Sequence, residues 1–274
     1  MSKIIFITGA SRGFGKLWAE AFLKRGDRVA AAARNLSALD DLVTKYSNNI
    51  LPVQLDVTDR EAVAKAVDQV VEHFGRIDIL FNNAGYGLFG TVEETTEEQA
   101  RAQMETNFFG LLWVTQAVLP VMRQQKSGHI IQVSSFLGLT TLPMLGLYNA
   151  SKFAVEGLTE TIASEVAHLG IKATLIEPNG FATEWAGNSA IQTTADISDY
   201  APVRAAFAES GDNPDTWGKP EATVDAILKV VDSQNPPLRL LLGKIAYQVV
   251  EGVYTKRLSE IKEWKDVSIS AHGH

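Results

Sequence analysis

The chain has 274 residues, of which 46% are hydrophobic and 21% charged, and its formal net charge is −7 at pH 7. These values are typical of a soluble globular protein with one or two domains. The acidic balance argues against broad nucleic-acid binding, which depends on Lys and Arg. Because the chain has no cysteine, disulfides, cysteine-metal sites and thiol nucleophiles are excluded, and the cytoplasm is the expected location.

The first predicted strand covers residues 3–8, which are mostly β-branched or aromatic and apolar on both faces. A helical apolar pattern follows and ends at Gly26, so the glycines between them lie in a strand-to-helix turn. There Gly9 would make the tight turn, Gly13 would let a ligand approach the backbone, and Gly15 would let helix and strand pack closely. Free N–H groups at the helix start attract a phosphate. A glycine-rich turn without a ligand is the alternative.

Further strand-like apolar runs alternate with helical patterns along the chain. The expected strands cover residues 28–33, 50–55, 77–81, 129–133, 172–176 and 238–242. This alternation predicts an α/β fold, a doubly wound parallel sheet of about seven strands with helices on both faces, in a single domain over residues 1–274.

Helix signals lie between these strands. Thr58 and Glu61 are expected to form a capping box for a helix that ends at Gly75. Longer helices are expected over residues 97–125 and 148–169.

The last third of the chain is less regular. Residues 184–220 are rich in Ala, Ser, Thr and Asp and show no strand pattern, so we interpret them as a substrate-loop insertion. A final helix at about 243–264 carries Val249, Val250 and Val253 on one stripe. We expect this helix to pack on the domain rather than to contact a membrane.

A second motif lies just after the fifth strand. Tyr148 and Lys152 are four residues apart, so on a helix they share one face, and Ser135 ends the preceding strand. The carboxyl ends of parallel strands meet at one edge, where the glycine turn also lies. A tyrosine with a pKa near ~10 needs a shift of about three units to act near neutral pH, and one ammonium at ~4 Å supplies on the order of 4 kcal/mol. Lys152 is therefore expected to lower the pKa of Tyr148.

Together these motifs resemble the short-chain dehydrogenase/reductase family, in its single-domain, NADP-preferring branch, from residue 3 to about 242. The matching parts are Thr8-Gly9-x-x-x-Gly13-x-Gly15, Asp56-Val57, Asn82-Asn83-Ala84-Gly85, Asn107, Ser135 thirteen residues before Tyr148, Lys152, and the loop from Pro178 to Thr183. One departure is Asn179, where the family usually has glycine. The resemblance implies a Rossmann-like fold and an NADP(H)-dependent oxidoreductase.

The resemblance also implies roles for individual residues. Tyr148 would donate a proton to the substrate oxygen while hydride arrives from the nicotinamide, and Ser135 would hydrogen-bond that oxygen. Lys152 would also hold the ribose, and Asn107 would position a water. Asn83 could equally tie strands together. The expected cofactor-binding residues are Gly9, Ser11, Arg12, Gly13, Phe14, Gly15, Arg34, Asp56, Val57, Asn83, Ala84, Gly85, Tyr148, Lys152, Pro178, Gly180 and Thr183.

The end of the second strand decides between the two cofactors. An acidic side chain there would bind the ribose 2′-hydroxyl of NAD, but Ala33 and Arg34 stand at this place. Arg34 and Arg12 would instead hold a 2′-phosphate, which favours NADP(H). The alternative is that Arg34 is a solvated strand end.

An apolar pocket is expected from Leu137, Met144, Leu145, Phe181 and Trp185. The predicted activity is NADPH-dependent reduction of an apolar ketone or aldehyde, or the reverse oxidation of an alcohol. Two alternatives are open: a redox sensor that binds NADPH without turnover, and a nucleotide-sugar epimerase or dehydratase of the related longer branch.

The expected partners are few. No metal site is expected, because His73, His129 and His168 lack metal-like spacing. No apolar run approaches the roughly 18 residues of a membrane span, so none is expected. The resemblance implies a homodimer or homotetramer in which the helices at 97–125 and 148–169 pack against their copies.

Overall fold

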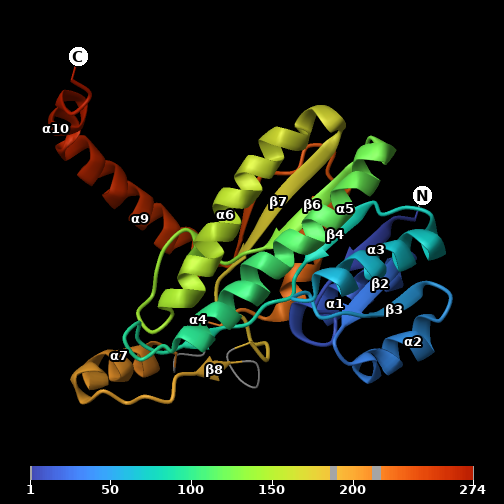
Figure 1. Cartoon of the computed structure of the whole chain (residues 1–274), viewed down its shortest axis with the longest axis horizontal. Coiled ribbons are helices and arrows are strands. Elements are labelled where there is room, and N and C mark those ends of the chain that lie inside the picture. Colours follow the sequence, from blue (N-terminus) through green and yellow to red (C-terminus); the bar gives the residue numbers. More distant parts are fainter. Residues whose placement is uncertain (1, 186–189, 212–216, 274) are drawn as a thin grey trace.

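Seven strands form one parallel sheet in the order β3-β2-β1-β4-β6-β7-β9 (Figure 1). The structure, a computed structural model, describes residues 2–185, 190–211 and 217–273. The strand order reverses between β1 and β4, so the predicted doubly wound sheet is confirmed. The strands are β1 (Ile4–Ile7), β2 (Arg28–Ala33), β3 (Ile50–Gln54), β4 (Ile79–Asn82), β6 (Gly128–Val133), β7 (Ile171–Pro178) and β9 (Arg239–Leu242).

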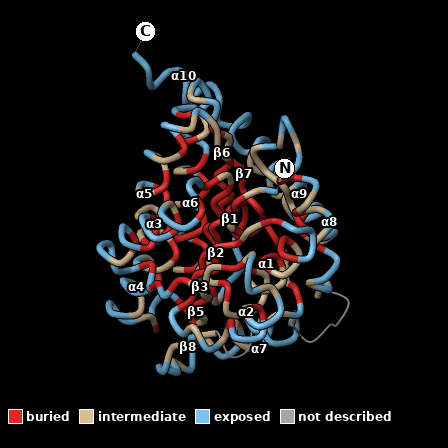
Figure 2. The backbone as a smooth tube through the Cα atoms, turned by 90° about the vertical axis from the view of Figure 1, so that its right-hand side faces the viewer, coloured by how far each residue is buried: buried red, intermediate tan, exposed pale blue. Residues whose placement is uncertain are grey.

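Helices cover both faces of the sheet, because successive strand residues point to opposite sides. Ile5 and Ile7 face a core shared with α1 and α8, whereas Ile4 and Phe6 face a second core shared with α3, α5 and α6. Figure 2 shows the buried residues gathered around the central strands. The helices of these two layers are α1 (Gly13–Arg25), α2 (Asp40–Tyr46), α3 (Arg60–Phe74), α5 (Leu111–Gln125), α6 (Gly146–Val166) and α8 (Val224–Asp232).

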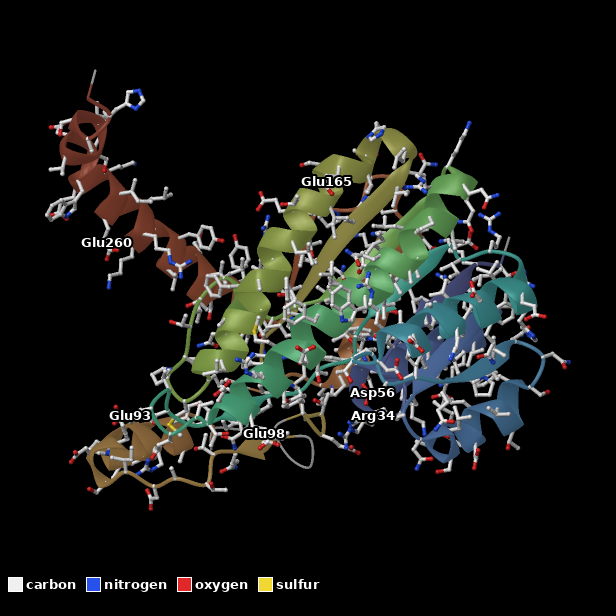
Figure 3. All side chains as sticks on the ribbon, in the orientation of Figure 1. Arg34, Asp56, Glu93, Glu98, Glu165 and Glu260 are labelled. Atoms are coloured by element: carbon white, nitrogen blue, oxygen red, sulfur yellow. The ribbon has the colours of Figure 1, made fainter. Side chains whose placement is uncertain are left out.

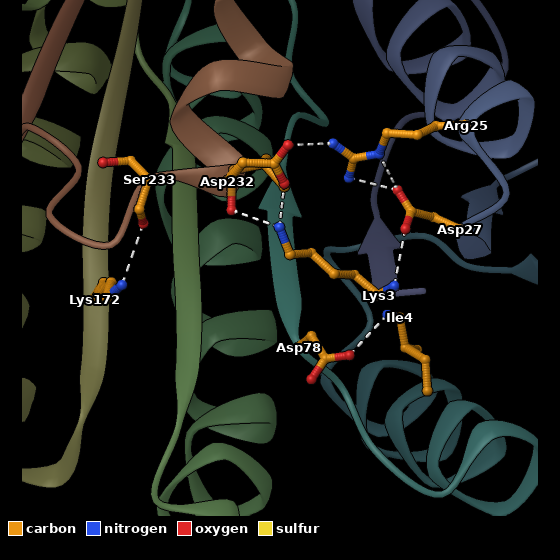
Figure 4. A network of polar contacts seen from close by, with 9 residues as sticks. Lys3, Ile4, Arg25, Asp27, Asp78, Lys172, Asp232 and Ser233 are labelled. Carbon is orange, nitrogen blue, oxygen red and sulfur yellow. Dashed lines mark hydrogen bonds and ion pairs between the residues drawn. The ribbon is translucent and has the colours of Figure 1, made fainter. Parts of the chain in front are cut away.

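A polar network closes the amino-terminal edge of the sheet (Figure 4). The Asp27 carboxylate accepts the backbone N–H of Lys3 at 2.9 Å and pairs with Arg25. Arg25 also pairs with Asp232 at 2.9 Å, and the Lys3 ammonium contacts the same carboxylate. These bonds tie the start of β1 to the ends of α1 and α8, so the charged groups at this edge serve stability.

Helix α3 is capped differently from the prediction. Asp59 is the N-cap residue, and its carboxylate accepts the N–H groups of Glu61 and Ala62, both at 3.0 Å. Thr58 instead donates its N–H and hydroxyl to Asp56 at 3.0 and 2.8 Å. The predicted capping box of Thr58 and Glu61 is therefore wrong, because the neighbouring carboxylate takes the cap position.

The predicted helix over residues 97–125 contains one widened turn. Helix α4 (Glu97–Met104) and helix α5 are joined by a π-helical segment, Glu105–Gly110. Such turns are rare and occur often at functional sites. This one holds Asn107, a predicted catalytic residue.

Residues 184–220 contain a strand and an α-helix that were not predicted from the sequence. Strand β8 (Ile191–Gln192) pairs with β5 (Leu88–Phe89), and helix α7 (Ala201–Gly211) follows. The interpretation of this segment as free of strands is wrong, because a strand of two exposed residues leaves no pattern in the sequence. Residues 186–189 and 212–216 of the predicted insertion lie outside the described residues.

Helices α9 (Lys244–Glu263) and α10 (Lys265–Ser270) project away from the body (Figure 1). Near its start Ala246 is fully buried, but Leu258 and Ile261 are 54% and 67% exposed. The expectation that the final helix packs on the domain therefore holds only for its first turns and is wrong for the rest. In the described part of the chain, no helix combines the length and apolar character needed to cross a bilayer.

Candidate active site

The turn between β1 and α1 has a backbone shape that requires its glycines. Gly9 and Gly13 have φ angles of 66° and 53°, and a Cβ on Gly15 would lie 2.3 Å from the Gly9 carbonyl oxygen. Arg12, the N-cap of α1, places no side-chain hydrogen bond on the first turn. The N–H groups of that turn are therefore available to an anion such as a phosphate.

Tyr148 and Lys152 lie one helical turn apart on the buried side of α6. Tyr148 is 5% and Lys152 6% exposed. The Lys152 Nζ lies 5.7 Å from the centre of the Tyr148 ring and donates a 2.8 Å hydrogen bond to the carbonyl of Val133, at the end of β6. This bond holds the ammonium at the carboxyl edge of the sheet.

Ser135 follows β6 and lies next to Tyr148. Its Oγ accepts the N–H of Leu137 at 3.1 Å and donates to the carbonyl of Pro178 at 3.4 Å. The hydroxyl also interacts with the Tyr148 phenol, whose pKa it lowers. Ser135, Tyr148 and Lys152 are thus brought together at one edge of the sheet.

Burial has the largest effect on the pKa values of the Tyr148 phenol and the Lys152 ammonium. It raises the pKa of Tyr148 above its ordinary value, and the Ser135 hydroxyl offsets this only in part. It also lowers the pKa of Lys152 to about 8, against the opposing effect of the Glu156 carboxylate. In the chain by itself burial therefore prevails, and the lowering expected from Lys152 together with an oxidised nicotinamide stays a prediction. Near neutral pH the phenol keeps its proton, as a proton donor must.

Asn107 connects the π-helical segment to the turn after β4. Its Oδ1 accepts the N–H of Tyr86 at 3.1 Å, and its Nδ2 donates to the Tyr86 carbonyl at 3.0 Å and to Ser151 Oγ at 3.2 Å. A Cβ on Gly85 would lie 3.1 Å from Asn107 Oδ1 and 3.8 Å from Lys152 Nζ. Asn107 Oδ1 and the Lys152 ammonium therefore both lie beside Gly85, in the turn after β4.

Asn83 ties the glycine turn to the end of β4. Its Nδ2 donates to the carbonyls of Thr8 and Gly9 at 3.0 and 3.1 Å. The backbone N–H groups of Asn83 and Ala84 donate to Thr8 Oγ1 at 3.0 and 3.1 Å. These bonds favour the strand-tying interpretation of Asn83, and they join β1 to β4 where the strand order reverses.

Exposed charged residues lie in the glycine turn and after the strands next to it. Arg34 and Asp56 follow the neighbouring strands β2 and β3, and both are exposed (Figure 3). Arg12 forms a 3.6 Å ion pair with Glu184, in which the two side chains are 44% and 53% exposed. Such exposed pairs contribute only about 0–1 kcal/mol. Arg12 can therefore leave Glu184 for a more strongly charged ligand.

An apolar cluster surrounds the Tyr148 ring. Two residues of the predicted pocket, Leu137 and Leu145, belong to this cluster. A third, Trp185, packs on Tyr148 with ring centres 4.9 Å apart. Phe89, whose ring lies 5.4 Å from Trp185, was not predicted as a pocket residue, because its strand is too short to show a pattern.

The other two residues of the predicted pocket lie elsewhere. Phe181 packs edge-on against Phe14 at 5.2 Å, in the core between the sheet and α1. Met144 has a φ of 67° and lines a separate groove beside α6. The structure therefore does not bring either residue into the cluster around Tyr148.

Asn179 is accommodated by a glycine on a neighbouring strand end. A Cβ on Gly243, whose φ is 98°, would lie only 1.7 Å from Asn179 Oδ1. The Asn179 Nδ2 donates to the carbonyl of Gly180 at 2.7 Å. The missing side chain at position 243 leaves the room that the larger residue needs after β7.

Two carboxyl groups that the sequence analysis did not single out are buried next to the site. Glu156 lies one turn after Lys152, and Glu177 directly precedes Pro178; they are 5% and 0% exposed. The Nε of Arg239 lies 3.1 Å from Glu156 and 3.6 Å from Glu177. Burial and the Glu156 carboxylate raise the pKa of Glu177 to about 9. Glu177 is therefore protonated near neutral pH, and no pattern of charged residues in the sequence reveals this.

We expect Glu177→Gln to stabilise the protein at alkaline pH. Because the pKa of Glu177 rises from 4.5 to about 9 on folding, the folded state binds the additional proton between these values. The free energy of unfolding then falls as the pH rises, by at most about 1.4 kcal/mol per unit. Glutamine removes this slope, so the variant should match the wild type near pH 5 and exceed it near pH 9.

Urea denaturation at several pH values measures this effect. Glu160→Gln is the control, because Glu160 also contacts Arg239 but is exposed. A wild-type stability that does not fall between about pH 5 and about pH 9 would contradict the assignment of a protonated Glu177.

Similar proteins exist among curated sequences and solved structures. A family model described as short chain dehydrogenase matches residues 3–209. The 3-ketodihydrosphingosine reductase of Bacteroides thetaiotaomicron is 40% identical over 89% of this chain and 88% of its own length. A short-chain dehydrogenase of Streptomyces avermitilis superposes with a TM-score of 0.92 at 37% identity, over 98% of both chains. A short-chain dehydrogenase of Burkholderia cenocepacia in complex with NADP gives a TM-score of 0.76 at 27% identity, over 96% of this chain and 97% of the other.

Proposed function

The chain belongs to the short-chain dehydrogenase family of oxidoreductases, and we propose that it reduces an apolar ketone or aldehyde with NADPH. The proposal is carried by one observation: Ser135, Tyr148 and Lys152 meet beside an apolar cluster, at the sheet edge that also holds the glycine turn. The NADP complex of the Burkholderia cenocepacia protein supports the cofactor. The name of the Bacteroides thetaiotaomicron relative supports a ketone as substrate.

The strand ends offer groups that fit a dinucleotide. The open N–H groups at the start of α1 would bind its pyrophosphate. Asp56 and Val57 would contact the adenine, and the exposed Arg34, with Arg12, would bind the 2′-phosphate. The loop from Pro178 to Thr183 would hold the nicotinamide end. Bound NADPH supplies the hydride.

The chain itself supplies the proton. The buried Tyr148 phenol, which keeps its proton near neutral pH, would donate it to the substrate oxygen, and Ser135 would donate a hydrogen bond to the same oxygen. Lys152, with a pKa of about 8, carries its charge at pH 7 and would stabilise the phenolate that is left. Asn107, which lies beside Gly85 together with the Lys152 ammonium, would hold a water through which that proton is replaced.

The substrate class is tested with a series of methyl ketones of increasing chain length. We expect kcat/KM with NADPH to rise by about fourfold for each added methylene, because each buried CH₂ contributes about 0.8 kcal/mol. The loss of NADPH absorbance measures the rate, and dihydroxyacetone is the polar comparison. A rate that does not depend on chain length, or a preference for dihydroxyacetone, would refute an apolar substrate.

A further inference from the structure

The second half of the C-terminal helix exposes apolar side chains that the body of the protein does not cover. We define the arm as residues 251–270 of α9 and α10. In it Leu258, Ile261 and Trp264 are 54%, 67% and 62% exposed, and Val267 and Ile269 are 58% and 56% exposed. Of the twelve large apolar side chains exposed in the described residues, seven lie on α9 and α10, and an eighth, Trp264, lies at the turn between these two helices. Contiguous exposure of this kind marks an interaction surface.

The arm is amphipathic and self-complementary in charge. Tyr254, Leu258 and Ile261 recur at a spacing of four and three residues, so they form one stripe. Glu251 and Lys262 flank this stripe on the same side, because eleven residues make slightly more than three full turns. If two arms lie antiparallel about an axis midway between these residues, Glu251 of each copy faces Lys262 of the other, and the stripes meet.

An apolar groove borders the arm near that axis. It has a volume of about 690 Å³ and lies along the side of α6 that carries Ala150 and Phe153. Val92, Leu142 and Phe153, three of the remaining four exposed large apolar residues, line it, and Arg257 of the arm closes one side. A second arm laid along the first would therefore also cover the groove.

The charges of the arm favour a protein over a lipid surface. Helices that lie on membranes concentrate Lys and Arg on their polar face. Here the polar face mixes Lys256 with Glu260 and Glu263, and Figure 3 shows Glu260 on this arm. The whole chain carries a net charge of −7, which opposes binding to anionic lipid.

We propose that the occupant of the arm is a second copy of this chain, with the two arms packed antiparallel around a two-fold axis near residues 256 and 257. Such a contact is closed, because the same surface serves both copies. It is separate from the faces of α5 and α6 through which the family resemblance implies assembly, and it does not depend on the proposed substrate or cofactor.

Engineered cysteines give the decisive test, because the chain has none of its own. In the double variant Glu251→Cys and Lys262→Cys, position 251 of each copy lies within disulfide distance of position 262 of the other copy, so two disulfides can form across the contact. We expect a covalent dimer under mild oxidation. Neither single variant should form it efficiently, and neither should the control pair Lys256→Cys and Glu263→Cys on the polar face. Absence of a covalent dimer of the double variant would overturn the antiparallel pairing.

A second experiment removes the apolar contact without introducing cysteine. Ile261→Glu with Trp264→Glu should raise the dissociation constant of the assembly at least about 100-fold in sedimentation velocity. The two substitutions remove two large apolar side chains from each copy, and so four from the contact between the copies. Lys256→Glu with Glu263→Lys is the control and should assemble like the wild type. Circular dichroism checks the fold. The proposal is overturned by an unchanged assembly, or by a monomeric wild type that binds vesicles of phosphatidylcholine and phosphatidylserine.

Discussion

Tyr148→Phe is expected to lower kcat by at least about 100-fold and to leave the fold and the affinity for NADPH almost unchanged. The change removes one hydroxyl from a side chain that is 5% exposed and keeps the ring against Trp185. Loss of a general acid costs about 10²–10⁴ in rate. Since burial raises the pKa of this phenol, it is a donor that holds its proton until the substrate oxygen takes it.

Three measurements separate this role from a structural one. Single-turnover rates report the chemical step, NADPH fluorescence reports binding, and urea denaturation reports stability. Tyr46→Phe is the control, because its hydroxyl contacts Glu20 far along the chain from α6. A folded Tyr148→Phe variant with near-normal turnover would exclude Tyr148 as the proton donor.

The sheet could be predicted because its strands are short runs rich in apolar residues, and central ones such as β1 and β4 are buried along their whole length. Such runs leave a clear pattern, whereas β5 and β8, with two residues each, leave none. The exposure of the arm could not be predicted for a different reason. An apolar stripe on a helix looks the same in the sequence whether its own domain or another copy covers it, so only the exposure of Ile261 and Trp264 reveals the difference.

The candidate site was predictable where its residues follow strands. Ser135 and the glycine turn lie at carboxyl ends, which must meet at one edge of a parallel sheet. The protonation of the site was not predictable, because it depends on desolvation. Burial raises the pKa of the Tyr148 phenol and keeps a proton on Glu177, and neither effect of burial can be read from residue types alone.

The wild type is expected to prefer NADPH over NADH by about 100-fold or more in kcat/KM. Arg34 is exposed at the end of β2, and Arg12 is held only by a weak ion pair with Glu184. Both can turn to a 2′-phosphate, and charge-assisted hydrogen bonds contribute about 1.5–3 kcal/mol each. NADH offers a neutral hydroxyl there. The rate with NADPH at low concentration should therefore fall with salt far more than the rate with NADH.

Ala33→Asp combined with Arg34→Ala is expected to reverse this preference. The new carboxylate at the end of β2 would accept a hydrogen bond from the 2′-hydroxyl of NADH and repel the phosphate of NADPH. Arg76→Ala is the control, because Arg76 lies before β4 at the opposite edge of the sheet, where it pairs with Asp78. kcat/KM with each cofactor, measured at two salt concentrations, gives the result. Equal use of both cofactors by the wild type, or a double variant that still prefers NADPH, would show that Arg34 is a solvated strand end and that the phosphate is held by other groups.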